Sequence, residues 1–141
     1  MRYVLDSSAA IQWVLPEKDS AKAIRLRDDY KNAVHELLAP AIFPAEMLNA
    51  LTKAERTKRI NVGDARVLYQ AIIADTPALH PYHALLDRAG EVASRFRVAV
   101  YDCLYLALAE REACELVTAD VRFLNNLQPH FPFLVDLASL P

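Results

Sequence analysis

Short apolar segments of strand length alternate with longer helical segments along this chain, and that alternation restricts its possible folds most strongly. The first such segment, Tyr3-Val4-Leu5, runs directly into Asp6 and is followed by a helical run that Pro16 ends. Strand–helix alternation of this kind predicts an α/β protein, with a mainly parallel sheet of about four to five strands flanked by helices on both faces. Further strands are expected at 37–40, 115–118 and 133–135, and the connector at 76–82 has room for a short extended piece.

The helices expected between these strands follow from the spacing of apolar residues and from capping signals. Asp19-Ser20 can cap a helix that runs to about Val34, and Pro44 fits the first turn of a helix that runs to about Ile60. Further helices are expected at 9–15, from Asp64 to just before Pro77, at 83–96 and from Asp102 onward, with a short helix or turn at 121–127. With no repeat, linker or low-complexity tract, residues 1–141 are expected to form a single domain.

Composition excludes several functional classes. Hydrophobic residues make up 54% of the chain and charged residues 24%, which is typical of a compact globular protein. No apolar run approaches the roughly 18–20 residues that span a bilayer, and no signal segment is recognisable, so a cytoplasmic protein without membrane contact is expected. Only two glycines are present, which excludes the GxGxxG and GxxxxGK[ST] phosphate-binding motifs. No Cys or His spacing is typical of a zinc site.

Four acidic residues stand where catalytic groups collect in a parallel α/β domain. Asp6 and Asp120 follow strand-like runs, whereas Glu46 and Asp102 lie in the first turns of apolar helices. Strand carboxyl ends and the helix starts that follow them meet at one edge of the sheet, so all four are candidates for one pocket. Each acid alone could be only a helix cap or a dipole partner, but four in one small chain are hard to explain that way.

A cluster of four carboxylates is typical of a site for Mg²⁺ or Mn²⁺, because these cations prefer oxygen ligands and relieve the repulsion between the acids. Such a site suits hydrolysis of phosphodiester bonds. The formal net charge of −2 argues against a nucleic-acid partner at first, yet without the four acids the chain has 14 acidic residues against 16 Lys and Arg. The composition therefore permits a nucleic-acid substrate. Ser7 or Ser8 can cap the first helix, which would leave the Asp6 carboxylate free for a cation.

At these positions the chain resembles the PIN-domain ribonucleases, specifically the VapC-type toxins of bacterial and archaeal toxin–antitoxin pairs. The resemblance covers essentially the whole chain, and it implies that Asp6, Glu46, Asp102 and Asp120 are the acidic metal ligands and catalytic residues. Ser8 and Thr118 match hydroxyl positions that support the site. The matching motifs are Tyr3-Val4-Leu5-Asp6-Ser7-Ser8-Ala9 with Trp13, Pro44-Ala45-Glu46-Met47-Leu48-Asn49-Ala50-Leu51, Tyr101-Asp102-Cys103-Leu104-Tyr105-Leu106-Ala107-Leu108-Ala109, and Leu116-Val117-Thr118-Ala119-Asp120 with Phe123-Leu124.

The resemblance implies a PIN-like fold and endonucleolytic cleavage of RNA, such as tRNA or rRNA, that depends on Mg²⁺ or Mn²⁺. It also implies two protein partners, a second copy of the chain and a cognate antitoxin. A housekeeping RNA-processing nuclease and a non-catalytic RNA- or protein-binding module of the same fold remain as alternatives. Phosphatases of the haloacid dehalogenase type are disfavoured because they need Asp-x-Asp after the first strand, where Ser7-Ser8 follow Asp6 here. A response-regulator receiver would need paired early acids and a late lysine, and Thr118-Ala119-Asp120-Val121 supplies no such lysine.

Overall fold

A computed structural model describes all residues, 1–141, and contains one parallel sheet of five strands. Parallel pairing joins every pair of neighbouring strands, which confirms the predicted α/β class. The connector at 76–82 does contain a strand, at the edge of the sheet. In the spatial order β3-β2-β1-β4-β5 the strands are β3 (Ala78–His80), β2 (Glu36–Pro40), β1 (Arg2–Leu5), β4 (Glu115–Thr118) and β5 (Leu134–Asp136).

The strand order places a topological switch point between β1 and β4. From β1 the chain moves to β2 and β3 on one side, and it later returns to β4 and β5 on the other side. Connections that diverge in this way leave a crevice outside the carboxyl ends of the two central strands, where α/β proteins bind ligands. Asp6 directly follows β1, and Asp120 lies two residues after the end of β4.

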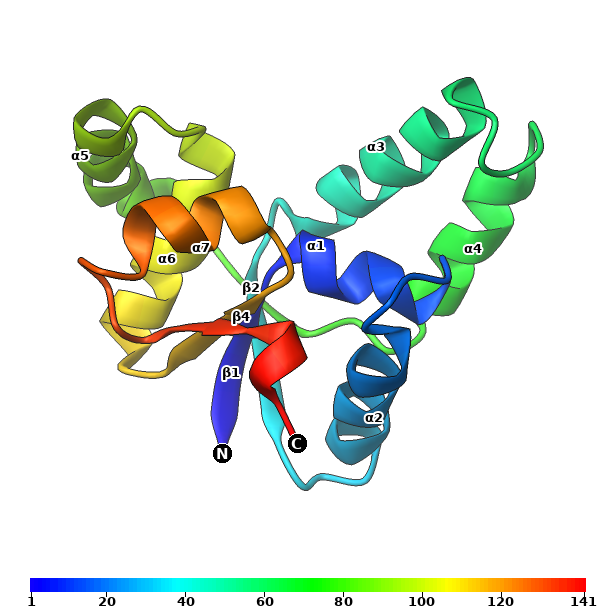
Figure 1. Cartoon of the computed structure of the whole chain (residues 1–141), viewed down its shortest axis with the longest axis horizontal. Helices are drawn as coiled ribbons and strands as arrows, with labels where there is room; N and C mark the ends of the chain where they lie inside the picture. Colours follow the sequence, from blue (N-terminus) through cyan, green and yellow to red (C-terminus); the bar gives the residue numbers. More distant parts are fainter.

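Seven α-helices and three short 3-10 helices surround the sheet (Figure 1). The first helix is a single turn continued by the 3-10 helix η1 (Ile11–Trp13), and together they match the run expected at 9–15. The α-helices are α1 (Ser7–Ala10), α2 (Ser20–Lys31), α3 (Phe43–Arg56), α4 (Asp64–Ile73), α5 (Leu86–Phe96), α6 (Val100–Glu112) and α7 (Val121–Leu127), and the remaining 3-10 helices are η2 (His83–Leu85) and η3 (Leu137–Ser139).

Two helices end earlier than the sequence pattern indicates. Helix α2 ends at Lys31 rather than near Val34, because Ala33 turns into the left-handed region with φ of 60°. Helix α3 ends at Arg56 rather than near Ile60, and Lys58 has φ of 64° in the same region. A left-handed residue after the last turn terminates a helix, and glycine is the usual residue there. Alanine and lysine at these positions gave no such signal in the sequence.

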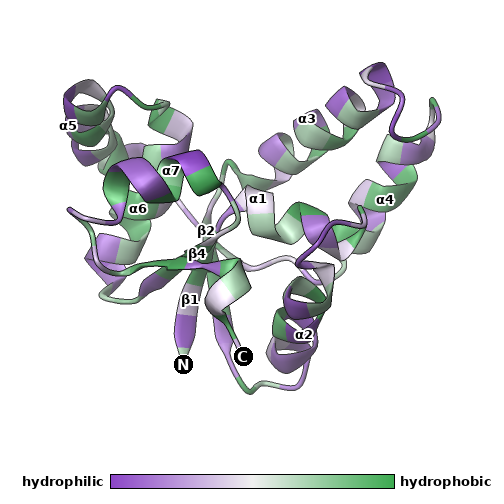
Figure 2. Ribbon diagram, viewed as in Figure 1, coloured by the Kyte–Doolittle hydropathy of each residue, from purple (hydrophilic) through white to green (hydrophobic).

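Helix α6 forms the centre of the hydrophobic core. All seven residues from Cys103 to Ala109 are buried, and the helix packs against β1, β2 and α5. A helix that is apolar on all sides is buried on all sides. Figure 2 shows the contrast with α3, α4 and α5, where polar and apolar residues alternate along the ribbon. The first turn of α6, which carries Asp102, is therefore held in place by a deeply packed element.

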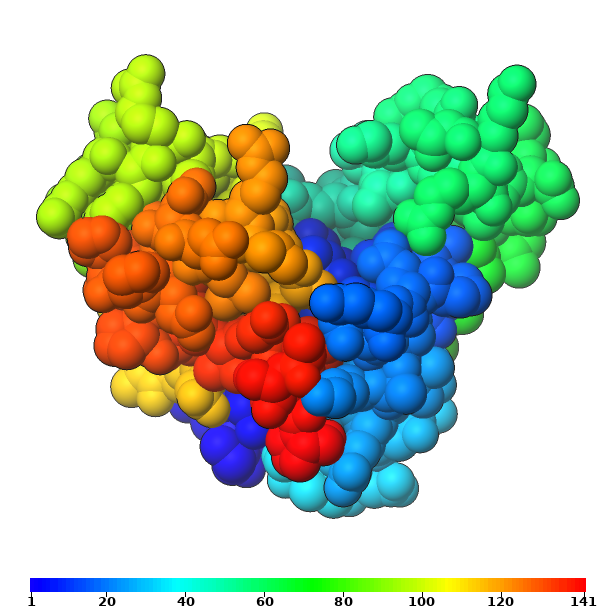
Figure 3. Space-filling model, viewed as in Figure 1, coloured from blue at the N-terminus to red at the C-terminus, as the bar shows by residue number.

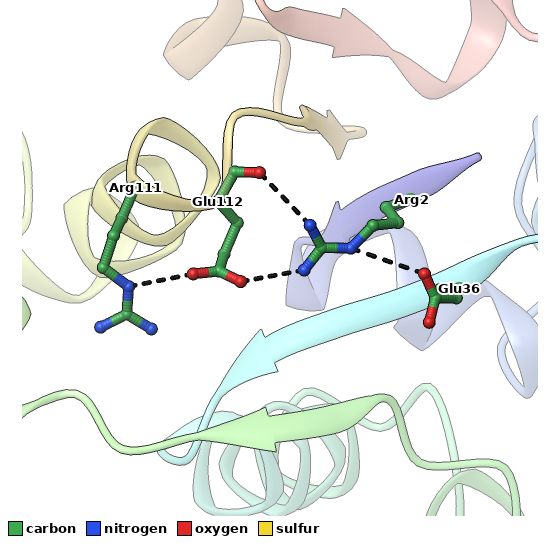
Figure 4. Close-up of polar contacts among 4 residues, drawn as sticks. All are labelled: Arg2, Glu36, Arg111 and Glu112. Carbon is green, nitrogen blue, oxygen red and sulfur yellow. Dashed lines mark hydrogen bonds and ion pairs between the residues drawn. The ribbon is translucent and has the colours of Figure 1, made fainter.

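An ion-pair network lies at the edge of the sheet where the strands begin, opposite the carboxyl edge (Figure 4). The Arg2 guanidinium donates to the Glu112 carboxylate over 2.9 Å and lies 3.5 Å from Glu36 on β2. Arg111 also contacts Glu112, over 3.2 Å. The exposed fractions of these side chains range from 23% for Glu112 to 72% for Glu36, so water screens each pair and its contribution to stability is small. The network ties the start of β1 to β2 and to the end of α6, far from the carboxyl edge.

The helices form two arms that rise from the carboxyl edge of the sheet (Figure 1). Helices α3 and α4 pack against each other in one arm, while α5, α6 and α7 make up the other. Figure 3 shows an open groove between the arms, with the segment coloured blue, which includes α1, at its base. The carboxyl edge of the sheet therefore opens into this groove. No helix combines the length and apolar character needed to cross a membrane.

Candidate active site

The four acidic residues predicted from the sequence lie at the starts of four different helices. Asp6 occupies the N-cap position of α1, and Asp120 occupies that of α7. Glu46 and Asp102 lie in the first turns of α3 and α6, as expected. None of the four takes part in any of the nine ion pairs of the chain. None of the four carboxylates is therefore neutralised by an ion pair.

Asp6 is held by two hydroxyl groups that bind the same carboxylate oxygen. Ser8 Oγ donates to Asp6 Oδ2 over 2.5 Å, and Thr118 Oγ1 donates to that oxygen over 2.9 Å. The backbone N–H of Asp6 donates to the carbonyl of Val117 over 2.9 Å, which places Asp6 beside the end of β4. Both hydroxyl groups act on Oδ2, and neither engages Oδ1. One oxygen is thus fixed and the other is available to a ligand.

The capping expected of the two serines does not occur. The start of α1 has no side-chain cap, and the Ser8 hydroxyl instead contacts Asp6 and accepts the backbone N–H of Ala119 over 3.0 Å. Asp6 itself occupies the N-cap position, and the two serines lie inside the first turn of α1, where a side chain cannot cap the helix start. Asp6 is nevertheless free of a capping role, and the two hydroxyls keep its side chain in one orientation.

Asp120 combines a structural role with its place in the cluster. Its Oδ1 accepts the backbone N–H of Phe123 over 3.1 Å and so caps α7, while its own N–H donates to Thr118 Oγ1 over 3.1 Å. Thr118 therefore contacts both Asp6 and Asp120 and links the two strand-end acids. The cap fixes one carboxylate oxygen of Asp120, and the other remains without a protein hydrogen bond.

Glu46 has a partner that the sequence motifs did not reveal. The Tyr105 hydroxyl donates to Glu46 Oε1 over 2.6 Å, and Tyr105 is completely buried. Tyr105 lies three residues after Asp102 on α6, so the two side chains share one face of the helix. Burial raises the pKa of Glu46 above its usual range, the Tyr105 hydrogen bond opposes that shift, and the charge of Asp6 adds to it. Tyr105 orients Glu46 as the hydroxyls orient Asp6.

Asp102 shows most clearly that the four acids form one electrostatic unit. Burial, followed by the charges of Asp6, Glu46 and Asp120, raises the pKa of Asp102 to about 7. The pKa of Asp6 is also raised, chiefly by burial, with the hydroxyl hydrogen bonds opposing the shift and Asp120 adding to it. Like charges that disfavour each other's ionisation in this way are relieved by a bound cation.

The side-chain arrangement fits a hydrated hard cation better than a closed cage. No three of the acidic, His or Cys side chains of the chain are drawn together tightly enough to enclose a metal ion directly. Mg²⁺ keeps several of its waters and commonly binds proteins through one or two carboxylates. A set of oxygen donors with shared negative charge and fixed orientations satisfies that requirement without a preformed cage.

Replacing Thr118 by valine tests the hydroxyl support of Asp6. The variant keeps the shape of a completely buried side chain and removes a donor to the Asp6 carboxylate. We expect a loss of about 1.5–3 kcal/mol in the free energy of unfolding near pH 8, since a buried charged acceptor loses a partner. The loss should become smaller as the pH falls and Asp6 is protonated. Because the pKa of Asp6 is raised, its carboxylate loses its charge at a higher pH than an ordinary Asp does.

Chemical denaturation at pH 8 and at successively lower pH values measures this effect. Thr52→Val is the matched control, since Thr52 lies on α3 and its hydroxyl bonds only to a backbone carbonyl, over 3.1 Å. Equal losses for both variants, or a loss for Thr118→Val that does not change with pH, would contradict the role assigned to Thr118.

Two small cavities border the acidic cluster. A cavity of about 260 Å³ lies between α3 and α6 and is lined by Glu46, Asn49 and the exposed Tyr101, among others. A second cavity, of about 280 Å³, includes Asp102 and Asp120 in its wall together with Arg97 and Arg122. Neither arginine was predicted as a site residue. The only sequence feature that could have indicated them is their closeness along the chain to Asp102 and Asp120.

Helices α3 and α4 and the segment between them carry five basic residues, Lys53, Arg56, Lys58, Arg59 and Arg66. Arg59 pairs with Glu17 over 3.3 Å and is therefore already engaged. The other four are exposed and belong to no ion pair; they are Lys53, Arg56, Lys58 and Arg66. These four side chains form a solvated basic surface on the arm.

Comparison with known proteins gives a consistent result. The family model described as PIN domain matches residues 3–126. VapC ribonuclease Mb0985 of Mycobacterium bovis is 29% identical over 132 residues, covering 94% of this chain and 96% of that protein. Ribonuclease VapC3 of Pyrobaculum aerophilum is 31% identical over 137 residues, covering 96% and 98%.

Solved structures show the same fold. The crystal structure of PAE2754 from Pyrobaculum aerophilum superposes with a TM-score of 0.70 at 23% identity, covering 99% of this chain and 94% of that one. VapBC2 from Rickettsia felis, solved bound to a DNA fragment from the promoter, gives a TM-score of 0.60 at 17% identity, covering 96% and 97%.

Proposed function

This chain belongs to the PIN domain family, and we propose from that membership that it is an endoribonuclease that depends on Mg²⁺ or Mn²⁺. One observation carries the proposal above the others. Asp102 lies where its ionisation is opposed by burial and by the charges of Asp6, Glu46 and Asp120, at the switch point of a parallel sheet. Such a cluster suits binding of a divalent cation and hydrolysis of a phosphodiester bond.

The relatives support a toxin of a toxin–antitoxin pair. Proteins named VapC ribonuclease match nearly the whole chain, and the structural neighbour from Rickettsia felis is a VapBC complex. We propose accordingly that the chain is one nuclease domain, 1–141, that pairs with a second copy of itself and with a cognate antitoxin that blocks the acidic site. Structured RNA such as tRNA or rRNA is the proposed substrate, which would place the activity in the cytoplasm.

Asp6, Glu46, Asp102 and Asp120 would hold the cation. When bound, it supplies charge stabilisation for the phosphoryl oxygens and lowers the pKa of the attacking water. The protein's own contribution is orientation: Ser8 and Thr118 fix one oxygen of Asp6, Tyr105 fixes one oxygen of Glu46, and the α7 backbone fixes one oxygen of Asp120. Each contact holds one oxygen of a carboxylate in place, which limits the reorganisation needed when substrate and cation bind.

Purified protein is expected to cleave bulk tRNA or rRNA when Mg²⁺ or Mn²⁺ is present and to lose that activity in excess chelator. Gel analysis of the RNA measures the cleavage, and restoring the cation to the chelated sample is the control. In cells, induced expression is expected to arrest growth, and co-expression of the antitoxin is expected to relieve the arrest. Full cleavage in excess chelator would refute the metal dependence. Harmless expression combined with cleavage would favour an RNA-processing nuclease over a toxin.

A further inference from the structure

The cavity of about 280 Å³ beside the acidic cluster combines opposite charges in one small space. Two acids, Asp102 and Asp120, and two arginines, Arg97 and Arg122, all line it. The remaining wall is formed by Val98, Ala99, Phe123 and Asn126. The arginines come from the α5–α6 connection and the first turn of α7, in the arm opposite α3 and α4 (Figure 1).

Neither arginine is used by the fold. Arg97 and Arg122 are both exposed and belong to none of the nine ion pairs of the chain, even though two carboxylates line the same cavity. By contrast, Arg2 and Arg88 each contact two carboxylates. Two guanidinium groups without an ion pair line the same cavity as two acids without an ion pair. This combination indicates a ligand that carries an anionic group for the arginines and also contacts a cation held by the acids.

A single-stranded stretch of a structured RNA, bound at the acidic cluster, is a ligand of this kind. A phosphodiester at the cluster would be joined to another phosphate one nucleotide away, beyond the reach of the cation. The planar fork of arginine matches phosphate oxygens, and most phosphate contacts position a nucleic acid without reading its sequence. Resting on the function proposed above, we propose that Arg97 and Arg122 bind the phosphate adjacent to the scissile one and thereby set the register of the RNA strand.

The backbone at Arg97 provides a variant that separates binding from folding. Arg97 follows the last turn of α5 in the left-handed region, with φ of 59°. Glycine adopts this conformation without steric cost, whereas a residue with a Cβ does so unfavourably. Arg97→Gly is therefore expected to fold at least as well as the wild type while it removes the guanidinium. A weaker RNA complex in this variant could not be attributed to a damaged fold.

The first measurement is the salt dependence of RNA binding. A fluorescently labelled single-stranded RNA of mixed sequence, about 20 nucleotides long, is titrated with protein in Mg²⁺ on a cleavage-deficient Asp102→Asn background. Loss of one phosphate contact lowers the slope of log K against log salt by about 0.7 for a single strand. Arg97→Gly and Arg122→Ala should each show this change, with affinity several-fold weaker. Arg25→Ala should show none, since exposed Arg25 lines a cavity with Met1 and Tyr3 at the opposite edge of the sheet.

The second measurement uses bis(p-nitrophenyl) phosphate, which has a single phosphate and therefore no neighbour for the arginines to bind. With Asp102 intact, hydrolysis of this diester should be unchanged in Arg97→Gly and Arg122→Ala, while kcat/KM for RNA falls. Unchanged salt slopes in both variants would overturn the proposal, and so would an equal loss on the small diester and on RNA. A wild type that binds RNA with the expected slopes but never cleaves it would instead count against the nuclease function and leave the phosphate contact standing.

Discussion

Replacing Asp102 by asparagine is expected to lower RNA cleavage by at least about a thousandfold, which corresponds to about 4 kcal/mol of activation free energy. The substitution keeps the size of the side chain but removes the carboxylate that is electrostatically coupled to all three other acids. An amide oxygen is a weaker ligand for Mg²⁺ than a carboxylate, and the cluster loses one of its four negative charges. Cleavage of a labelled RNA at saturating Mg²⁺ measures the effect.

The same substitution is expected to stabilise the metal-free protein at pH 8. Burial and the neighbouring charges hold the pKa of Asp102 near 7, so its ionised form is disfavoured in the folded protein relative to the unfolded chain. Asparagine removes that unfavourable charge. Water screens a group that is only partly buried, so the gain in the free energy of unfolding should be about 1 kcal/mol. A variant that is inactive and yet melts at a higher temperature cannot owe its inactivity to misfolding.

Asp87→Asn is the matched control for both measurements. Asp87 also lies in the first turn of a helix, α5, but it is exposed and belongs to no ion pair. The control should keep wild-type cleavage and should not gain stability. The site assignment would be wrong if Asp102→Asn cleaved RNA as well as Asp87→Asn. The electrostatic account would be wrong if Asp102→Asn melted below the wild type at pH 8 in the absence of cations.

The sequence was sufficient to predict the parallel sheet and the positions of the acids because both follow from local rules. An acid after a short apolar run must lie at the end of a strand, and Pro44 places Glu46 in a first turn. Parallel strands then bring these ends to one edge. Residues separated by more than a hundred positions, such as Asp6 and Asp120, could be placed together in this way before any contact was known, and the charge of Asp120 does act on Asp6.

The contacts that orient the acids were less accessible from sequence. Ser8 had two available roles, capping α1 or binding Asp6, and only the position of β4 beside Asp6 decides between them. Tyr105 resembled any other core residue of an apolar helix, because its hydroxyl partner Glu46 lies 59 residues away. Strand β3, three residues long and partly exposed, forms only because β2 offers it a free edge. In each case, contacts with distant parts of the chain determine the structure.

A divalent cation is expected to raise the melting temperature of the wild type, and to do so more at pH 8 than at pH 6. Binding only to the folded protein stabilises it by about 2.7 kcal/mol when the free cation is about 100 times its Kd. Below pH 7 the cation must displace a proton from Asp102, so its affinity falls by about tenfold for each pH unit. Thermal melts with and without Mn²⁺ at the two pH values measure the difference.

Without a cation, the stability of the protein should instead fall as the pH rises. The two opposite pH dependences together identify the acidic cluster as their cause. A carboxyl group whose pKa is raised on folding, as that of Asp102 is, stabilises the folded state when protonated, and that stabilisation is lost as the pH rises toward 7. Raising the pH therefore lowers the metal-free stability contributed by the cluster while it strengthens cation binding. Asp102→Asn should flatten both trends, whereas Asp87→Asn should leave them as in the wild type. A Mn²⁺-induced shift of equal size at pH 6 and pH 8 would show that the cation binds elsewhere.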